Sequence, residues 1–193
     1  MKRVKRLCVY CGSAGAVDPR YREAATRLGV AMARADIELV FGGGRIGLMG
    51  LVADAIVAHG GRAIGVIPGF LRDAEVAHQG VTELVVTSSM HERKRAMADR
   101  SDAFAVLPGG IGTLDEMFEI LTWRHLGLHN KPIFIVDIGR YWSRLRELLD
   151  HLVAQGFAAP LVPRLLSFVP DVEELISALS ETAEPSQPRT ELL

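Results

Sequence analysis

Short hydrophobic runs recur along the chain, and glycine, proline or charged residues end most of them. Within each run the hydrophobic residues are nearly continuous rather than alternating with polar ones, which is typical of strands buried on both faces of a parallel sheet. We therefore predict strands at residues 7–10, 37–41, 62–67, 84–86, 103–107, 133–136 and 167–169.

Segments with helical periodicity separate these runs. Asp18 and Pro19 indicate where the first helix begins, because aspartate is a favoured helix cap and proline suits the first helical turn. We predict helices at residues 19–34, 48–58, 91–100 and 113–126, with a further helix after each of the last two strands.

Strands that alternate with helices indicate parallel strands joined by right-handed crossovers. We expect a Rossmann-like, doubly wound α/β fold, in which one parallel sheet forms the middle layer of a three-layer α/β/α sandwich. In such sheets ligands bind at the carboxyl ends of the strands, near the switch in strand order. The 193 residues show no linker-like shift in composition. We therefore expect one domain over residues 1–180 and a flexible tail over 181–193.

Charge and composition exclude several classes of function. Lys and Arg number 22 against 23 for Asp and Glu, and only 6% of residues are aromatic, so the chain offers no general attraction for nucleic acid or a membrane surface. No apolar stretch approaches the roughly 20 residues that cross a bilayer, and none forms a signal peptide. We expect Cys8 and Cys11 to be free thiols in a reducing cytoplasm.

Two glycine-rich segments, GGGRIG at 42–47 and PGGIGT at 108–113, each follow a predicted strand and open a helix. Glycine lets the backbone approach a ligand closely, and the amides at a helix N-terminus attract anions. Either segment alone could serve only to pack a strand against a helix, but two at one edge of the sheet favour a phosphorylated ligand. Neither matches the P-loop or the dinucleotide fingerprint, so an NTPase and a dehydrogenase are disfavoured.

Charged residues flank these segments. The run MHERKR at 90–95 could be a solvated helix face, and Asp115 and Glu116 could simply complement a helix dipole. Placed beside a phosphate, however, an arginine can bind anions or hydroxyl pairs with its planar fork. A carboxylate there can stabilise the positive charge that develops on ribose when a glycosidic bond breaks. Glycosidic cleavage therefore suits this set of residues.

The motifs CGS at 11–13, GGGRIGLMG at 42–50, MHERK at 90–94 and PGGIGTLDE at 108–116 together resemble the LOG ("lonely guy") proteins, which are often mislabelled as lysine decarboxylases. The resemblance spans about residues 7–178, and Ala14 departs from it where serine is frequent. It implies a cytokinin riboside 5'-monophosphate phosphoribohydrolase. Such an enzyme cleaves the N-glycosidic bond of N6-modified AMP, and in many relatives of AMP, to release the free base and ribose 5-phosphate.

The resemblance also implies site residues. Arg93 and Glu116 would be catalytic, and Met90 would line the base pocket. The full set expected to bind substrate is Gly43, Gly44, Glu75, Met90, Arg93, Lys94, Gly109, Gly110, Ile111, Gly112, Thr113, Leu114, Asp115, Glu116 and Thr122. No metal or cofactor is expected. A homodimer is implied, with a hexamer as the alternative, and the apolar helix near residues 47–58 would suit either the core or such an interface.

Three other functions compete with this interpretation. A non-catalytic carrier of a nucleotide or of molybdenum cofactor would bind without turnover. A single-strand DNA binder is disfavoured by the neutral charge balance and the few aromatic residues. A pyridoxal phosphate decarboxylase needs a lysine that forms a Schiff base, and neither Lys94 nor Lys131 lies in a suitable sequence setting.

Overall fold

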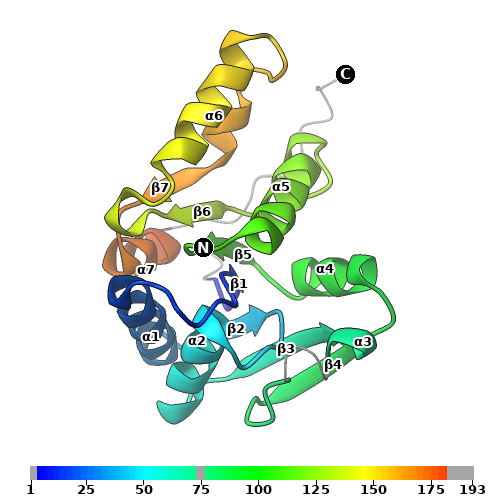
Figure 1. Ribbon diagram of the computed structural model, residues 1–193, viewed down its shortest axis with the longest axis vertical. Helices are drawn as coiled ribbons and strands as arrows, with labels where there is room; N and C mark the ends of the chain where they lie inside the picture. Colours follow the sequence, from blue (N-terminus) through cyan, green and yellow to red (C-terminus); the bar gives the residue numbers. More distant parts are fainter. Residues whose placement is uncertain (1–3, 73–76, 182–193) are drawn as a thin grey trace.

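A seven-stranded sheet runs through the centre of the computed structural model, which describes residues 4–72 and 77–181 (Figure 1). Its strands are β1 (Arg6–Tyr10), β2 (Glu38–Phe41), β3 (Ala63–Pro68), β4 (Glu83–Thr87), β5 (Ala103–Val106), β6 (Ile133–Val136) and β7 (Ser167–Val169). Every pairing is parallel, and the strand order is β4-β3-β2-β1-β5-β6-β7. This confirms the predicted doubly wound fold.

Helices cover both faces of the sheet. They are α1 (Pro19–Arg34), α2 (Gly47–Ala58), α3 (Gly69–Arg72), α4 (Met90–Asp99), α5 (Ile111–His125), α6 (Ser143–Ala154) and α7 (Val172–Glu181), with 3₁₀ turns η1 (Ile138–Arg140) and η2 (Val162–Leu165). Helices α1, α2 and α7 contribute to one hydrophobic cluster and α4, α5 and α6 to another on the opposite face. Figure 1 shows these two groups on either side of the strands. The result is the expected three-layer sandwich.

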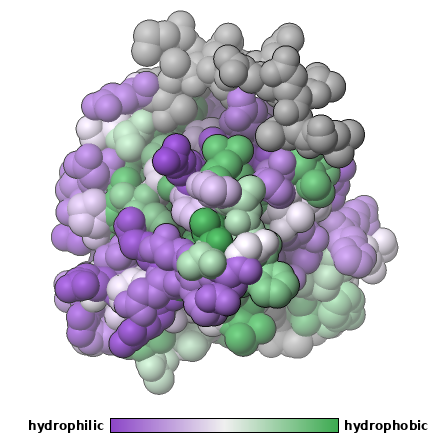
Figure 2. All heavy atoms as spheres, turned by 90° about the horizontal axis from the view of Figure 1, so that it is seen from above, coloured by the Kyte–Doolittle hydropathy of each residue, from purple (hydrophilic) through white to green (hydrophobic). Residues whose placement is uncertain are grey.

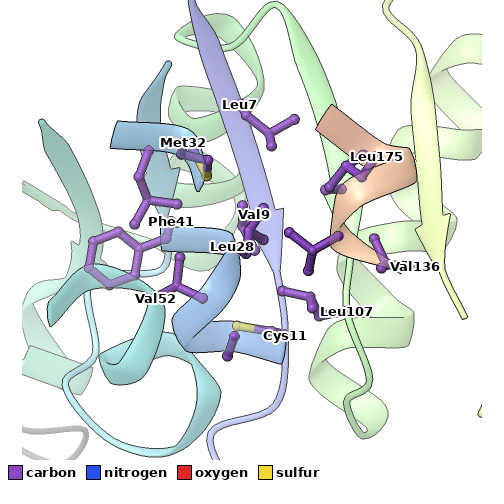
Figure 3. Packing of buried hydrophobic residues seen from close by; sticks show 14 of the residues in the cluster. Leu7, Val9, Cys11, Leu28, Met32, Phe41, Val52, Leu107, Val136 and Leu175 are labelled. Carbon is purple, nitrogen blue, oxygen red and sulfur yellow. The ribbon is translucent and has the colours of Figure 1, made fainter. Parts of the chain in front are cut away.

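Strand β1 lies at the centre of both clusters. Leu7 and Val9 point into the cluster with α1, α2 and α7, whereas Cys8 and Tyr10 point into the other. Figure 3 shows the first of the two clusters, in which Val9 lies beside Leu28 of α1. Because β1 is buried on both faces, all of its core positions must be apolar, which explains the uninterrupted hydrophobic run.

The order of the strands switches direction at β1. From β1 the chain moves outward to β4 and then returns to place β5 on the other side of β1. The connections that leave the carboxyl ends of β1 and β5 therefore diverge to different sides, and a crevice opens between them. The Gly12 N–H donates to the carbonyl of Pro108 at 3.1 Å, which joins the two connections at this edge.

Local signals located most elements well. Asp18 caps α1 by accepting a hydrogen bond from the Arg20 N–H at 2.9 Å, and Pro19 is its first residue, as predicted. The helix predicted to begin at Thr113 begins at Ile111 instead, because the glycine-rich stretch forms its first turn. The short helix α3 was not predicted.

The apolar helix α2 is buried within its own chain. Seven of its residues are buried, including Leu48, Val52 and Ile56, which pack in the same cluster as α1. On the face seen in Figure 2, hydrophobic side chains are interspersed with hydrophilic ones. In the described ranges no helix is long and apolar enough to span a membrane. Residues 182–193 lie outside the described ranges, so the predicted tail stays a prediction.

Replacing Gly29 with alanine tests the packing of α1 against α2. A Cβ at Gly29 would lie 2.5 Å from the Val52 carbonyl oxygen and 2.7 Å from the Ala55 Cβ. The overpacking should outweigh the better helix propensity of alanine and destabilise the fold by about 1–3 kcal/mol. Gly15→Ala is the control, because its Cβ would meet nothing within 4 Å. Urea unfolding that gives equal stabilities for the two variants would contradict this packing.

Candidate active site

A cavity of about 230 Å³ opens at the crevice between the carboxyl ends of β1 and β5. Two segments supply most of its wall, the turn after β1 and the start of α5, and α2 and α4 add one side chain each. The lining residues are Cys11, Gly12, Ser13, Ala14, Met49, Arg93, Gly110, Ile111, Gly112, Thr113 and Glu116. The cavity thus lies at the switch point, where the fold predicts a ligand.

The N-terminus of α5 faces this cavity without a side-chain cap. Asp18 caps α1 and Ser89 caps α4, but the cap of α5 is Gly110, and its first turn holds no acidic residue. The first-turn amides have no carbonyl of their own helix to bind, and the helix dipole adds a positive potential there. This end of α5 is therefore suited to an anion such as a phosphate.

Two glycines of α5 leave the cavity open. A Cβ at Gly110 or Gly112 would meet no atom within 4 Å, and neither residue has a positive φ. Neither packing nor backbone conformation therefore requires glycine at these two positions, whereas a side chain there would occupy the space in front of the amides. Gly109 is different, because its Cβ would collide with the buried Thr113 side chain.

The first glycine-rich segment supports a side chain of the site rather than lining the cavity. A Cβ at Gly42 would collide with the guanidinium of Arg93. Gly43 has a φ of 77°, which favours glycine, and its carbonyl accepts a hydrogen bond from the His78 N–H at 2.9 Å. Gly44 pairs with Ala77 in an isolated bridge. Neither Gly43 nor Gly44 lines the cavity in the part of the chain that the structure describes.

Arg93 is buried, with only 5% of its surface exposed. Its Nε donates to the Val66 carbonyl and its Nη2 to the Gly42 carbonyl, both at 3.1 Å. Its Nη1 lies 3.6 Å from Oε1 of Glu116. Val66 lies in β3 and Gly42 directly follows the neighbouring strand β2. The two carbonyls hold the guanidinium in one orientation, with Nη1 near the carboxylate of Glu116.

The first turn of α4, which carries Arg93, is fixed by a reciprocal cap. The Ser89 hydroxyl oxygen accepts the Glu92 N–H at 3.1 Å, and the Glu92 carboxylate accepts the Ser88 N–H at 2.7 Å. The hydrogen bonds from Ser88 lower the pKa of Glu92. This capping box explains part of the charged run that the sequence shows here.

Glu116 faces the same cavity from α5. Its side chain is 11% exposed, and Thr113, one turn earlier, is buried and also lines the cavity. A carboxylate and a set of helix amides from α5 and a guanidinium from α4 therefore converge on one space. This arrangement can hold an anion while a charged pair acts on an atom next to it.

Lys94 lies beside this pair but points to other carboxylates. Its Nζ is 3.1 Å from Oδ2 of Asp115 and 3.1 Å from Oε1 of Glu119, and the residue is 7% exposed. Burial lowers the pKa of Lys94, but the hydrogen bonds to Asp115 and Glu119 outweigh this, so the pKa lies above its usual value. Lys94 therefore carries a full charge.

Met90, Leu114 and Thr122 are not among the described residues that line the cavity. Met90 begins α4, and its sulfur lies 3.9 Å from Nη1 of Arg93. Leu114 is half-buried in the first turns of α5, and Thr122 is exposed further along, with its hydroxyl donating to the Phe118 carbonyl at 2.7 Å. Glu75 lies outside the described residues.

Sequence reasoning omitted several wall residues from the expected site. Cys11, Gly12, Ser13 and Ala14 follow β1, and Met49 comes from α2. The turn after β1 carried a usable signal, since β1 is the central strand and its carboxyl end borders the switch point. Burial raises the pKa of the Cys8 thiol to about 12 and raises that of Cys11 further, so the thiol in the wall stays protonated.

The lysines do not fit a pyridoxal phosphate site. The Nζ of Lys94 is bound between two carboxylates, and that of Lys131 donates to the Ala98 carbonyl at 2.8 Å, near the amino ends of the strands. Neither lysine lines the cavity in the described part of the chain, whereas the decarboxylase chemistry needs an amine at the cofactor. Among the residues at 4–72 and 77–181, no cluster of His, Cys, Asp or Glu could hold a metal ion.

Tyr141 supports the start of α5 from outside the cavity. Its hydroxyl donates to the Gly109 carbonyl at 2.7 Å. The turn that carries Tyr141 is itself held by Asp137, whose carboxylate accepts the Trp142 N–H at 2.6 Å. In a trans peptide the carbonyl of Gly109 and the N–H of Gly110 point in opposite directions. The hydrogen bond from Tyr141 therefore holds the Gly110 N–H so that it points away from the Tyr141 hydroxyl.

The fold and the cavity define a Rossmann-like protein in which the uncapped start of α5, residues 110–113, lies beside the buried Arg93–Glu116 pair. We call this start of α5 the anion cradle. A family model described as "Possible lysine decarboxylase" matches residues 49–179. Over 180 residues the chain is 43% identical to the cytokinin riboside 5'-monophosphate phosphoribohydrolase LOG7 of Arabidopsis thaliana, covering 93% of this chain and 82% of the relative. The enzyme of the same name from Rhodococcoides fascians is 43% identical, with 91% and 89% covered. The chain belongs to the LOG family.

Solved structures with lower identity share the fold. The molybdenum cofactor carrier protein of Chlamydomonas reinhardtii matches with a TM-score of 0.70 at 21% identity, covering 92% of this chain and 96% of the other. DNA processing protein A of Helicobacter pylori, described as a single-stranded DNA binder, matches with a TM-score of 0.58 at 14% identity, covering 92% and 80%. These two likenesses establish the architecture alone.

Tyr141→Phe should weaken binding of ribose 5-phosphate about 3- to 10-fold, because the Gly109–Gly110 peptide loses the hydrogen bond that orients its amide. Isothermal titration calorimetry measures the dissociation constant. Tyr21→Phe is the matched control, because the Tyr21 ring packs edge-on against Tyr141 with 5.5 Å between centroids, and only its own hydroxyl is removed. Equal affinities for both variants would show that Tyr141 does not orient the cradle.

Proposed function

We propose that the protein hydrolyses the N-glycosidic bond of cytokinin riboside 5'-monophosphates, which are N6-modified AMP, and of AMP itself. The products are the free base and ribose 5-phosphate. The observation that carries the proposal is the Arg93–Glu116 pair, buried at 3.6 Å beside the uncapped start of α5. Similarity to relatives that are named as phosphoribohydrolases supports the same substrate class.

The 5'-phosphate binds at the amides of Gly110, Gly112 and Thr113. Gly110 and Gly112 leave room for its oxygens, and the Thr113 hydroxyl lies at the same wall. The cavity of about 230 Å³ is smaller than the roughly 300–1,000 Å³ that buries a drug-sized ligand. It therefore holds the sugar phosphate, and the base extends beyond it, past Met90 at the start of α4.

Glu116 acts on the reacting carbon of ribose. When the bond between C1' and the base nitrogen breaks, positive charge develops on the ribose ring, and a nearby carboxylate stabilises it. Glu116 also accepts a proton from the attacking water, whose oxygen forms the new bond to C1'. The base leaves with the bonding electron pair and takes up one proton, so that one water molecule is consumed.

Arg93 holds Glu116 in the ionised form and in one orientation. Its three other contacts, to Val66, Gly42 and Met90, fix the guanidinium from behind. A fixed cation next to a partly buried carboxylate favours its charged form. Arg93 thereby supports Glu116 as the general base, and the part of Arg93 that lines the cavity also orients the ribose hydroxyls.

We propose that two copies assemble as a homodimer, with a hexamer as the alternative. Ile111 lines the cavity although 82% of its surface is exposed, and the small cavity leaves the base uncovered. A second chain at this opening would bury both. Light scattering on the purified protein distinguishes one, two and six copies.

Glu116→Gln should lower kcat for release of base by 10²-fold or more, because the amide cannot accept the proton or stabilise the ring charge. Chromatography of the products from AMP and from isopentenyladenosine 5'-monophosphate, side by side, measures the turnover. Glu147→Gln is the control, because Glu147 pairs with Arg144 on the exposed face of α6. Full turnover by Glu116→Gln would refute the assignment.

A second variant separates binding from chemistry. Gly112→Ala places a methyl group in the cradle and should weaken ribose 5-phosphate binding by 10-fold or more, with no loss of thermal stability, because its Cβ meets no atom of the protein. Glu116→Gln should keep that affinity within about 3-fold of the original protein. Tight binding of nucleotide by the original protein with no turnover on either substrate would instead identify a carrier.

A further inference from the structure

Helices α4 and α5 are joined by a compact set of charges. Two consecutive cations of α4, Arg93 and Lys94, face three carboxylates of α5, Asp115, Glu116 and Glu119. Arg93 pairs with Glu116, and Lys94 pairs with the other two. The two helices come from different crossovers and lie over the same face of the sheet (Figure 1). The charges therefore fix the position of one helix relative to the other.

Lys94 is well suited to a fixed role between the helices. Its side chain is 9% exposed, and the side chain of Glu119 is 22% exposed, so this contact is largely shielded from water. A partly buried pair is much more sensitive to the loss of one partner than a surface pair. In the described part of the chain, the cavity wall includes Arg93 but not Lys94.

Among the described residues of α4 and α5, Lys94 is one of two cations that oppose three carboxylates at Glu116 and beside it. On α5, Asp115 is its neighbour in sequence, and Glu119 lies one turn further on the same side of the helix. From α4, Arg93 and Lys94 supply the two opposing charges. The Cys8 and Tyr10 side chains of β1 and the Cys11 side chain that follows it add no charge, because burial raises their pKa values. Without Lys94, these described pairs would keep only Arg93 opposite the three carboxylates.

We infer that Lys94 is a positioning residue that neutralises Asp115 and Glu119 and thereby keeps the carboxylate of Glu116 ionised and in place. The inference rests on the proposed function, in which Glu116 must be a carboxylate. Like charges near a carboxyl group favour its protonated form. Removal of Lys94 should therefore make Glu116 take up its proton at a higher pH, and removal of Glu119 should do the opposite.

The pH dependence of kcat/KM for AMP hydrolysis tests the predicted direction of these two changes in the protonation of Glu116. The acidic limb of the profile is the fall in activity at low pH as Glu116 becomes protonated. Lys94→Met should move this limb to higher pH by at least about half a pH unit, the size expected for one charge at short range in a partly shielded site. Glu119→Gln should move it downward. The double variant Lys94→Met with Glu119→Gln should return the limb to within about 0.3 unit of the original protein, because it removes one charge of each sign.

Two controls separate this role from others. Lys94→Arg keeps the charge and should leave the limb in place. Arg95→Met removes a neighbouring cation of α4 that pairs with Asp99 at the exposed surface, and it should not move the limb either. If Lys94→Met fails to fold, the shift of the acidic limb to lower pH in Glu119→Gln still tests the predicted direction.

Other results would overturn the inference. A Lys94→Met variant with a raised KM that Glu119→Gln does not restore would mean that Lys94 binds the substrate directly. A loss of thermal stability with an unmoved limb would reduce Lys94 to a structural residue. Absence of base release by the original protein would refute the proposed function first, and the role of Lys94 would fall with it.

Discussion

The buried guanidinium of Arg93 connects the parts of the protein that form the candidate site. It donates to the carbonyl of Gly42 after β2 and to that of Val66 in β3, and it approaches the carboxylate of Glu116 in α5. Burying a charge in this way is costly unless its hydrogen bonds are satisfied and a counter-charge is near. The glycine at position 42 is needed because any side chain there would displace the guanidinium. One buried cation thus constrains strand β3, the loop after β2, and helices α4 and α5.

The two glycine-rich segments consequently have different physical roles. Gly42 and Gly43 lie in close contact with their surroundings, so glycine is required there by packing and by backbone conformation. Gly110 and Gly112 have open space in front of them, so glycine is required there only if a ligand occupies that space. The same residue type therefore supports the framework in one segment and access to the backbone amides in the other.

The fold followed from the sequence because its signals are local. The buried run of β1 and the Asp18–Pro19 start of α1 predict their elements, and the alternation of strands and helices determines the class of sheet. The distinction between the two glycine segments does not follow from local signals. It depends on the position of the Arg93 guanidinium, more than 40 residues away from Gly42 in sequence.

The same limit applies to the charged residues of the site. The sequence shows Arg93, Lys94, Asp115 and Glu116 as two short charged groups, and helical spacing alone leaves their pairing undefined. The structure pairs Lys94 with Glu119, which sequence reasoning did not single out. A side chain predicted to contact substrate is thereby bound to carboxylates of its own chain, because the two helices meet over the sheet with these faces together.

Two proteins with different names share this architecture, so the reaction must be explained by the residues of the site and not by the fold. A molybdenum cofactor carrier and a DNA processing protein have the same fold, so a crevice at the switch point is not enough to define a reaction. An anion cradle alone binds a ligand equally well before and after its bonds change, and such uniform binding does not accelerate a chemical step. Hydrolysis needs a group that interacts more strongly with the charge that develops in the transition state. In the proposed reaction this group is Glu116, which is 11% exposed and lies 3.6 Å from Arg93, so its charge is screened less by water than that of a surface carboxylate.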